Sequence, residues 1–212
     1  ISMMGDKCMY EKSLKRMIDF ILSFLAIIFL SPILFLIVIA IKIDDFGPAL
    51  FTQERIGKNN KIFKIYKFRT MKTATPKDTP THLLENAEQY ITKIGAILRR
   101  TSLDELPQIF NIFAGDMSII GPRPALWNQE DLIALRSEYG VDKIRPGLTG
   151  WAQINGRDEL SVDEKVRYDV EYLESLSLKF DIKCFFATIF SVLKSDGIVE
   201  GKIVEPKETV VK

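Results

Sequence analysis

One stretch of the chain, from Phe20 to Ile41, contains no charged residue: FILSFLAIIFLSPILFLIVIAI. At 1.5 Å per residue, a helix of this length would extend over about 33 Å, enough to cross a hydrocarbon core of about 30 Å. The stretch is too long for a typical signal-peptide core, and no small-residue cleavage site follows it. We therefore expect a segment that stays in the membrane.

Ser31 and Pro32 lie near the middle of this stretch and limit how it can enter a bilayer. Proline inside a helix removes the hydrogen bond to the carbonyl four residues back, which costs about 3 kcal/mol. A break there would leave two arms of roughly 17 Å, each reaching about halfway through the bilayer. Basic residues flank the stretch at both ends, and basic flanks prefer the cytoplasmic side. The pattern favours a re-entrant hairpin, and a single crossing with a kink at Pro32 is the alternative.

The balance of acidic and basic residues argues against a nucleic-acid-binding protein. The 212 residues include 29 Lys and Arg against 28 Asp and Glu, so the chain is not expected to bind nucleic acid. Cys8 and Cys184 match no metal or redox spacing, which favours free thiols in a reducing compartment. His82, the single histidine, lies in a polar stretch typical of a surface loop. The length suits one compact domain plus the apolar segment.

Two acidic residues, Asp104 and Glu105, stand side by side and are closely followed by Pro107. Because proline is tolerated in a helix only in the first turn, we expect a helix to begin at or just before Asp104. That position would favour ionised carboxylates and attract phosphate. Neighbouring helical residues point about 100° apart, so one carboxylate could face a substrate and the other a metal ion. The simpler alternative is a capping box between Ser102 and Glu105.

Arg123 stands between Pro122 and Pro124. The two prolines limit the backbone freedom of the arginine. A guanidinium held in this way is well suited to bidentate recognition of phosphate. An ordinary loop charge is the alternative for Arg123 taken alone.

The segments around these residues predict a mostly helical domain with short strands. Residues 48–71 read as extended segments around a Gly-Lys-Asn-Asn turn. Residues 127–139 are typical of an exposed helix. Upstream of the acidic pair, one face of a helix is expected to carry four apolar residues: Ile91, Ile94, Ile97 and Leu98.

Two helices are expected near the C-terminal end. Residues 161–175 read as a helix capped by Ser161, with a capping box to Glu164. Residues 181–195 group several apolar side chains that could lie in the membrane interface or pack into the core. Those side chains are Phe185, Phe186, Ile189, Phe190 and Leu193.

Four motifs follow the apolar stretch in this order: YKFRTM, LDELPQ, GDMSIIGPRP and RPGLTGWAQ. With the membrane segment upstream, the chain resembles the bacterial sugar transferase family from about Lys15 to Lys194. These are monotopic phosphoglycosyl transferases that start glycan assembly on a polyprenyl phosphate, and their re-entrant segment centres on a Ser-Pro pair. The resemblance implies a small member, without the additional N-terminal membrane helices and further domain of larger ones.

The resemblance also implies roles for individual residues. Asp104 would be the nucleophile, and Glu105 would hold Mg²⁺. Asp169 would support the site from behind or lie near the metal, although an exposed helix charge is the alternative. Arg99, five residues before Asp104, matches the family's arginine at that offset and is expected to contact phosphate. The motifs contain the other residues expected to contact or shape the site for phosphates and nucleotide: Lys67, Arg69, Pro122, Arg123, Pro124 and Arg145.

In the implied reaction, Asp104 attacks the sugar-linked phosphorus of a UDP-sugar, releases UMP and becomes an aspartyl phosphosugar. Undecaprenyl phosphate then attacks this intermediate and gives an undecaprenyl diphosphosugar. This would be the first membrane step of capsule, O-antigen, exopolysaccharide or glycoprotein glycan synthesis. Two other functions stay open. One is a single-pass membrane protein that binds a nucleotide or a partner without chemistry. The other is a UDP-releasing glycosyltransferase, although the DxD pair that such enzymes often use is absent.

We therefore expect an α-rich monotopic membrane protein, with a re-entrant helix-break-helix hairpin and a compact cytoplasmic catalytic domain. That domain would carry amphipathic interfacial helices and a few short strands. The expected segments are an N-terminal piece (1–11), the re-entrant helix (12–43), the phosphoglycosyl transferase domain (44–195) and a mobile tail (196–212). It would lie on the cytoplasmic face of a bacterial inner membrane and contact UDP-sugar, undecaprenyl phosphate and phospholipid. The sequence identifies no sugar, and a homodimer is compatible with it but unsupported.

Overall fold

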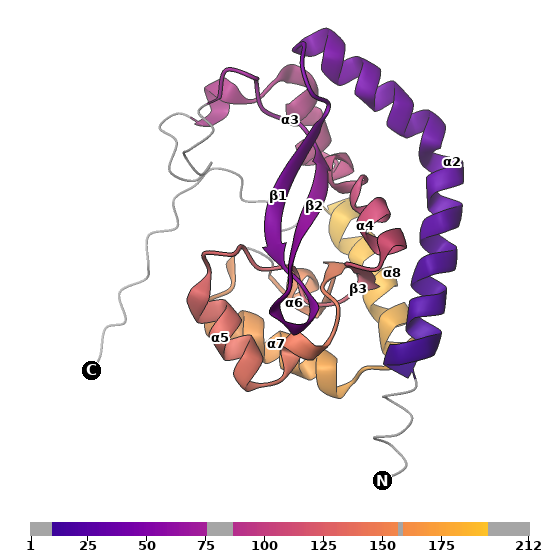
Figure 1. Cartoon of the computed structure of the whole chain (residues 1–212), viewed down its shortest axis with the longest axis vertical. Helices are drawn as coiled ribbons and strands as arrows, with labels where there is room; N and C mark the ends of the chain where they lie inside the picture. Colours follow the sequence, from indigo (N-terminus) through magenta and orange to yellow (C-terminus); the bar gives the residue numbers. More distant parts are fainter. Residues whose placement is uncertain (1–9, 76–86, 157–158, 195–212) are drawn as a thin grey trace, which may run out of the picture.

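The uncharged stretch forms most of one long helix, α2, which runs from Lys15 to Asp44 and arches along one side of the molecule (Figure 1). The computed structural model describes residues 10–75, 87–156 and 159–194. Within these ranges, α2 alone is long and apolar enough to cross a membrane. Only 17% of its most apolar window is buried inside the protein. Most of this apolar surface therefore faces outward, unlike that of a core helix.

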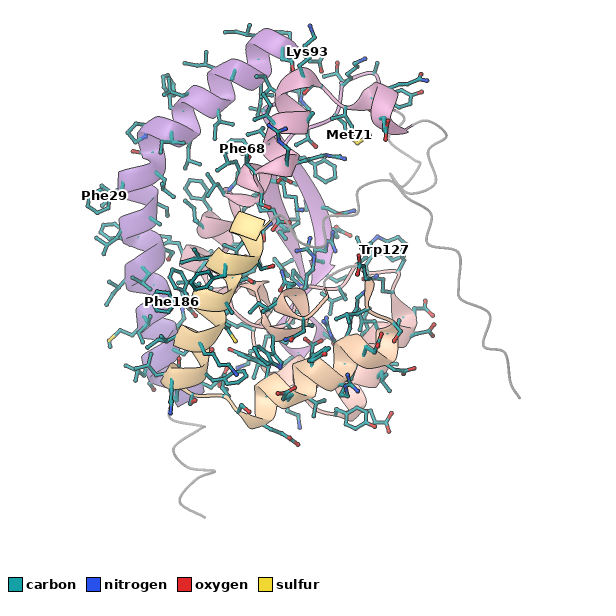
Figure 2. All side chains as sticks on the ribbon, turned by 180° about the vertical axis from the view of Figure 1, so that it is seen from behind. Phe29, Phe68, Met71, Lys93, Trp127 and Phe186 are labelled. Atoms are coloured by element: carbon teal, nitrogen blue, oxygen red, sulfur yellow. The ribbon has the colours of Figure 1, made fainter. Side chains whose placement is uncertain are left out.

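Ser31 and Pro32 lie inside α2 and do not end it. The Ser31 hydroxyl donates to the Ile28 carbonyl at 2.8 Å. Figures 1 and 2 show the helix changing direction just beyond Phe29. Loss of a single backbone donor bends the hydrogen-bond ladder here and leaves the turns on both sides intact. The expected break is therefore a bend within one helix, and re-entry into the membrane stays a prediction.

The inner side of α2 packs on the rest of the protein. Its C-terminal half places Leu34 and Ile41 in a core with Phe68, Leu98 and Ile109. Its N-terminal half lies on helix α4, Gln108–Ala114. The helix is therefore part of the same packed unit as the remainder, so the boundary expected at residue 43 does not separate two cores.

The two extended segments form an antiparallel hairpin, as predicted. Strand β1, Leu50–Ile56, pairs with β2, Ile62–Phe68, across the turn η2, Lys58–Asn60. Phe51 lies opposite Lys67, and Arg55 lies opposite Phe63. Because directly paired residues and every second residue share a face of the sheet, Arg55 and Lys67 project from the same face.

Short helices and a second small sheet surround the hairpin. Strand β3, Ser118–Ile120, pairs in parallel with β4, Gly147–Thr149. The remaining described elements are η1 (Tyr10–Leu14), η4 (Ala87–Tyr90), α3 (Lys93–Arg100), η5 (Leu103–Glu105), α5 (Glu130–Glu138), η6 (Val141–Lys143), α6 (Trp151–Ile154), α7 (Val162–Glu174) and α8 (Leu178–Lys194). The chain is mostly helical with short strands, as the sequence predicts.

Local patterns are confirmed for one helix and only partly for another. The capping box between Ser161 and Glu164 at the start of α7 is present in full. In α3, Leu98 is buried, but Ile97 is 50% exposed and Ile91 lies before the N-cap residue Thr92. The expected four-residue apolar face is therefore wrong at Ile91 and Ile97. The helix expected from residue 127 begins only at Glu130.

Helix α8 has one buried side and one exposed apolar side. Cys184 is fully buried, whereas four large apolar side chains on the other side are 41–64% exposed: Phe185, Phe186, Ile189 and Phe190. Figure 2 labels Phe186 on this outer face. The alternative that these four side chains pack into the core is therefore wrong. The side chain of Leu193, together with Cys8 and His82, lies outside the described residues.

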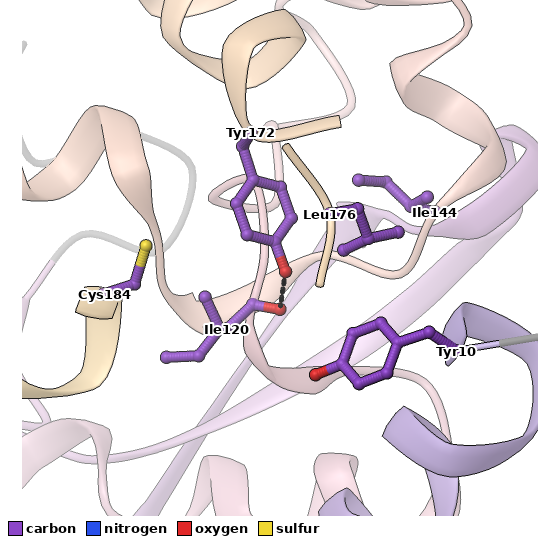
Figure 3. Packing of buried hydrophobic residues seen from close by; sticks show 6 residues of the cluster. All are labelled: Tyr10, Ile120, Ile144, Tyr172, Leu176 and Cys184. Atoms are coloured by element: carbon purple, nitrogen blue, oxygen red, sulfur yellow. Dashed lines mark hydrogen bonds between the residues drawn. The ribbon is translucent and has the colours of Figure 1, made fainter. Parts of the chain in front are cut away.

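A buried polar contact joins the start of α2 to the C-terminal helices. Asp181 of α8 accepts hydrogen bonds from Tyr10 at 2.6 Å and Lys15 at 2.5 Å. The Tyr172 hydroxyl lies 2.7 Å from the Asp181 carboxylate and 3.1 Å from the Ile120 carbonyl oxygen (Figure 3). The fold therefore fixes the N-terminal end of α2 against α7, α8 and β3.

Candidate active site

The acidic pair lies in a short 3-10 turn, η5, and not at the start of an α-helix. Ser102, just before it, has the left-handed φ of 56°, and its side chain makes no capping hydrogen bond. An N-cap residue usually has an extended backbone, so the left-handed turn prevents the capping box. Helix α4 begins only at Gln108, with Pro107 as its N-cap. A helical turn therefore does begin just before Asp104, at Leu103, but it is a 3-10 turn rather than the first turn of α4. The capping-box alternative is wrong.

Glu105 lies between two basic side chains from distant parts of the chain. Its Oε1 accepts from Lys67 Nζ at 2.7 Å and from Arg123 Nη2 at 3.1 Å. Burial raises the pKa of this carboxyl, but Arg123 and Lys67 outweigh burial and lower the pKa to about 2. Glu105 is therefore ionised at neutral pH. Asp104 lies in the same turn and is partly exposed.

The loop that carries Arg123 is held through four successive backbone carbonyls. Gly147 N–H donates to Pro122, Arg136 Nη1 to Arg123, Arg55 Nη1 to Pro124, and Ile56 N–H to Ala125, at 2.8–3.1 Å. Two of these four residues are prolines, which have no N–H of their own. The loop is therefore fixed by donors from β4, α5 and β1.

Arg55 lies near the acidic pair and was not among the expected site residues; in the sequence it is one of the basic residues that follow the uncharged stretch. It binds the Pro124 carbonyl through Nη1 and the Gln53 side chain through Nη2. Burial and the nearby Arg123 lower its pKa to about 10, while Glu105 acts in the opposite direction. The alternation of the hairpin could have predicted that Arg55 and Lys67 share a face of the sheet. The approach of Arg55 to Arg123 could not be predicted in this way, because it depends on the tertiary fold.

Asp169 is buried rather than exposed, so the exposed-charge alternative is wrong. Its Oδ2 accepts from Arg136 Nε at 2.9 Å and from Nη2 at 2.6 Å, and only 1% of its side chain is exposed. Arg136 in turn binds the Arg123 carbonyl at 2.8 Å. Asp169 therefore lies behind the Arg123 loop, one side chain removed from it.

Comparison with known proteins shows the family of the chain. Residues 10–195 match the family described as bacterial sugar transferase. The chain belongs to that family.

Several relatives have descriptive names. "UDP-glucose:undecaprenyl-phosphate glucose-1-phosphate transferase" of Escherichia coli K12 is 44% identical over 187 residues, covering 85% of this chain and 40% of the relative. An "UDP-N-acetylgalactosamine-undecaprenyl-phosphate N-acetylgalactosaminephosphotransferase" of Aeromonas hydrophila is 33% identical over 189 residues, covering 87% and 44%. "Exopolysaccharide production protein ExoY" of Sinorhizobium fredii is 36% identical over 197 residues, covering 86% and 87%. The chain thus spans less than half of the first two relatives and most of the third.

Two of the expected basic residues, Arg69 and Arg99, contact polar groups near the C-terminal ends of α2 and of β2. The Arg69 guanidinium donates to the carboxylate and to the backbone carbonyl of Asp45, the residue just after α2. Arg99 donates to the Thr70 hydroxyl at 2.8 Å, next to the end of β2. Arg69 therefore connects the C-terminal end of α2 to the hairpin, whereas Arg99 connects α3, the helix before η5, to the end of β2.

Arg145 lies at the far end of α4 from Glu105. Its Nε donates to the Gly115 carbonyl at 2.9 Å, while Arg16 donates to the Ile112 and Phe113 carbonyls. A helix of seven residues is about 10 Å long. Arg145 and Arg16 therefore cap the C-terminal carbonyls of α4, whereas Lys67 and Arg123 contact Glu105.

The carboxylates of the site limit how this chain could hold a metal ion. The described ranges contain no group of three or more His, Cys, Asp or Glu side chains arranged for a metal. Mg²⁺, however, is often held by one or two carboxylates together with substrate phosphates and water. Asp104 and Glu105 fit that second kind of site, with Glu105 already ionised.

Proposed function

We propose that this chain transfers a phosphosugar from a UDP-sugar to undecaprenyl phosphate and gives undecaprenyl diphosphosugar and UMP. The observation that carries the proposal is the acidic pair in η5, with Glu105 bound by Lys67 and Arg123. The names of two family relatives support the proposal, because each name contains both a UDP-sugar and undecaprenyl phosphate.

Asp104 would act as the nucleophile, as the resemblance to the family implies, while Glu105 binds Lys67 and Arg123. The carboxylate would attack the phosphorus that bears the sugar, and the bond from that phosphorus to the UMP oxygen would break. A phosphate oxygen of undecaprenyl phosphate would then attack the aspartyl phosphosugar and release the Asp104 carboxylate. Carboxylates that form acyl phosphates are an established solution in phosphoryl transfer.

The basic residues would supply the charge that such a reaction needs. Phosphoryl transfer depends mainly on positioning and on neutralising charge at the phosphate oxygens. Lys67 and Arg123 project towards the acidic pair, and Arg55 adds a buried positive charge close to Arg123. Arg99 would stabilise the approach to η5 through Thr70.

Mg²⁺ would be held by Glu105 and by phosphate oxygens of the donor. Metal ligands must be deprotonated to bind, and the low pKa of Glu105 meets this requirement. When bound, the ion would neutralise charge on the diphosphate of the donor. Lys67 and Arg123 keep the carboxylate ionised and oriented in the meantime.

The membrane arrangement follows from the apolar surfaces. The outer side of α2 and the exposed phenylalanines of α8 would lie in the bilayer and at its interface, respectively. One substrate is water-soluble and the other is fixed in the membrane, so the site would lie at headgroup height on the cytoplasmic face of a bacterial inner membrane. The re-entrant path of α2, with its bend near Ser31 and Pro32, would keep both of its ends on that face.

The decisive experiment is an assay of the released nucleotide. The protein in nanodiscs would be incubated with Mg²⁺, undecaprenyl phosphate and a panel that includes UDP-glucose and UDP-N-acetylgalactosamine. We expect UMP from one donor, and its loss in Asp104→Asn but not in Asp116→Asn, which alters an exposed carboxylate beyond α4. Release of UDP would instead indicate glycosyl transfer.

A second measurement addresses the covalent intermediate. Without the acceptor lipid, the intact mass of the protein should increase by one phosphosugar when the donor is added. Asp104→Asn should show no such adduct, whereas Asp116→Asn should. Turnover that persists in Asp104→Asn would refute the proposed nucleophile.

A further inference from the structure

Arg136 connects a fully buried acid in α7 to the backbone of Arg123. The guanidinium uses Nε and Nη2 for Asp169 and Nη1 for the Arg123 carbonyl. The side chain of Arg136 is itself 11% exposed and comes from the last turn of α5. A single planar group therefore spans two partners, an arrangement that the shorter, single-ended ammonium of lysine cannot reproduce.

This contact holds the peptide plane that joins Arg123 to Pro124. The plane itself is rigid, and the proline that follows restricts Arg123 to extended backbone values, so a bond to the carbonyl oxygen of this plane fixes the backbone of Arg123. Arg136 donates that bond. On the other side of the same loop, Arg55 binds the Pro124 carbonyl. The direction in which the Arg123 side chain leaves the loop is thus set by side chains that never touch Glu105.

We propose that Arg136, oriented by Asp169, is a positioning residue that aims the Arg123 guanidinium at Glu105 and at the phosphates of the donor. The part that concerns phosphates rests on the proposed function. The aim at Glu105 is independent of it, because the contact of 3.1 Å between Arg123 and Glu105 exists without substrate.

The first test compares Arg136→Lys with Ser137→Ala. Lysine keeps a positive charge beside Asp169 but cannot hold Asp169 and the Arg123 carbonyl together. Ser137→Ala removes the neighbouring attachment of α5 to Asn60 and leaves the Arg123 loop untouched. We expect Arg136→Lys to lower kcat for UMP release about 10- to 100-fold, the range that a displaced catalytic group produces. Ser137→Ala should stay within about twofold of the wild type.

A double-mutant cycle separates positioning from general loss of structure. If Arg136 acts through Arg123, Arg136→Lys should change the rate less than about twofold in an Arg123→Ala background. An equal loss in both backgrounds would overturn the proposal, as would a wild-type rate in Arg136→Lys. The pair Arg136→Met with Asp169→Leu guards against misfolding, since apolar replacement of a buried ion pair is often tolerated. We expect this pair to fold and to lose activity as Arg136→Lys does, and wild-type turnover in the folded pair would overturn the proposal.

Amide hydrogen exchange tests the same inference without any substrate. Peptides that cover residues 117–126 should exchange about tenfold faster in Arg136→Lys than in Ser137→Ala. Equal exchange in the two variants would overturn the proposal whatever the rates show. If the wild type releases no UMP from any donor, the proposed function fails, and the exchange result still decides the positioning role.

Discussion

The charge of Glu105 should make the stability of the protein depend on pH in a defined window. The pKa of its carboxyl is 4.5 in the ordinary state and about 2 in the folded protein. Because the folded value is the lower one, ionisation stabilises the fold above pH 4.5, and this contribution is lost as the pH falls through 4.5 towards 2. The difference of about 2.5 units, at 1.36 kcal/mol per unit, corresponds to about 3 kcal/mol.

The assay compares the wild type with Glu105→Gln. Chemical unfolding in detergent micelles would be followed at pH 7, 5, 4 and 3. At pH 3, about 2 kcal/mol of the Glu105 contribution should already be lost from the free energy of unfolding of the wild type. Glutamine does not titrate, so the variant should lack this component and retain the contributions of the other carboxylates.

A control on the same hairpin strengthens the comparison. Glu54 of β1 is exposed, and Glu54→Gln should keep the wild-type loss between pH 7 and 3 to within about 0.5 kcal/mol. If Glu105→Gln lost as much stability as the wild type over this interval, the argument that Lys67 and Arg123 hold Glu105 ionised would be refuted.

Two further predictions concern residues outside the acidic pair. Arg145→Met should lower the free energy of unfolding by about 1–2 kcal/mol, because a charged cap is lost from the Gly115 carbonyl. Since the side chain lies at the far end of α4, the KM for the UDP-sugar should stay at the wild-type value, and a rise in KM would instead indicate phosphate contact. Replacing Phe186 and Phe190 together with Glu should weaken binding to liposomes at least about tenfold, because two exposed apolar side chains would no longer enter the interface. The matched change of Lys179 to Glu, on the exposed start of α8, should weaken binding less, and equal effects would exclude a specific apolar contact.

Features that depend on near neighbours in the chain could be predicted from the sequence. The capping box of α7 needs only Ser161 and Glu164, and the hairpin needs a turn flanked by two extended runs. The acidic pair was expected in the first turn of the helix that contains Pro107, but it lies in the separate 3-10 turn η5. Ser102 has a left-handed backbone just before this turn, and since glycine is the usual signal for that conformation, nothing in the sequence indicated it. Local patterns therefore predicted which elements exist better than they predicted where η5 ends and α4 begins.

Asp169 shows a signal that was present and was not used. It lies three residues from both Val166 and Tyr172, and all three are buried on one stripe of α7. An acid within an apolar helical stripe requires a basic partner, because an unpaired buried charge is costly. The partner, Arg136, belongs to another helix, so the need for it could be predicted from the sequence but its identity could not.

Arg123 combines a fixed backbone with an accessible side chain, and this combination suits the proposed reaction. Its carbonyl and those of its neighbours are all bound, yet its side chain is 43% exposed, compared with 19% for Lys67 and Glu105. The guanidinium can therefore exchange Glu105 for an incoming phosphate by rotating its side chain, without rearranging the loop. Lys67 would remain on Glu105 during that exchange and keep the carboxylate ionised for the metal. A loop free to move would have to be ordered at each turnover, and the bound carbonyls remove that entropic cost in advance.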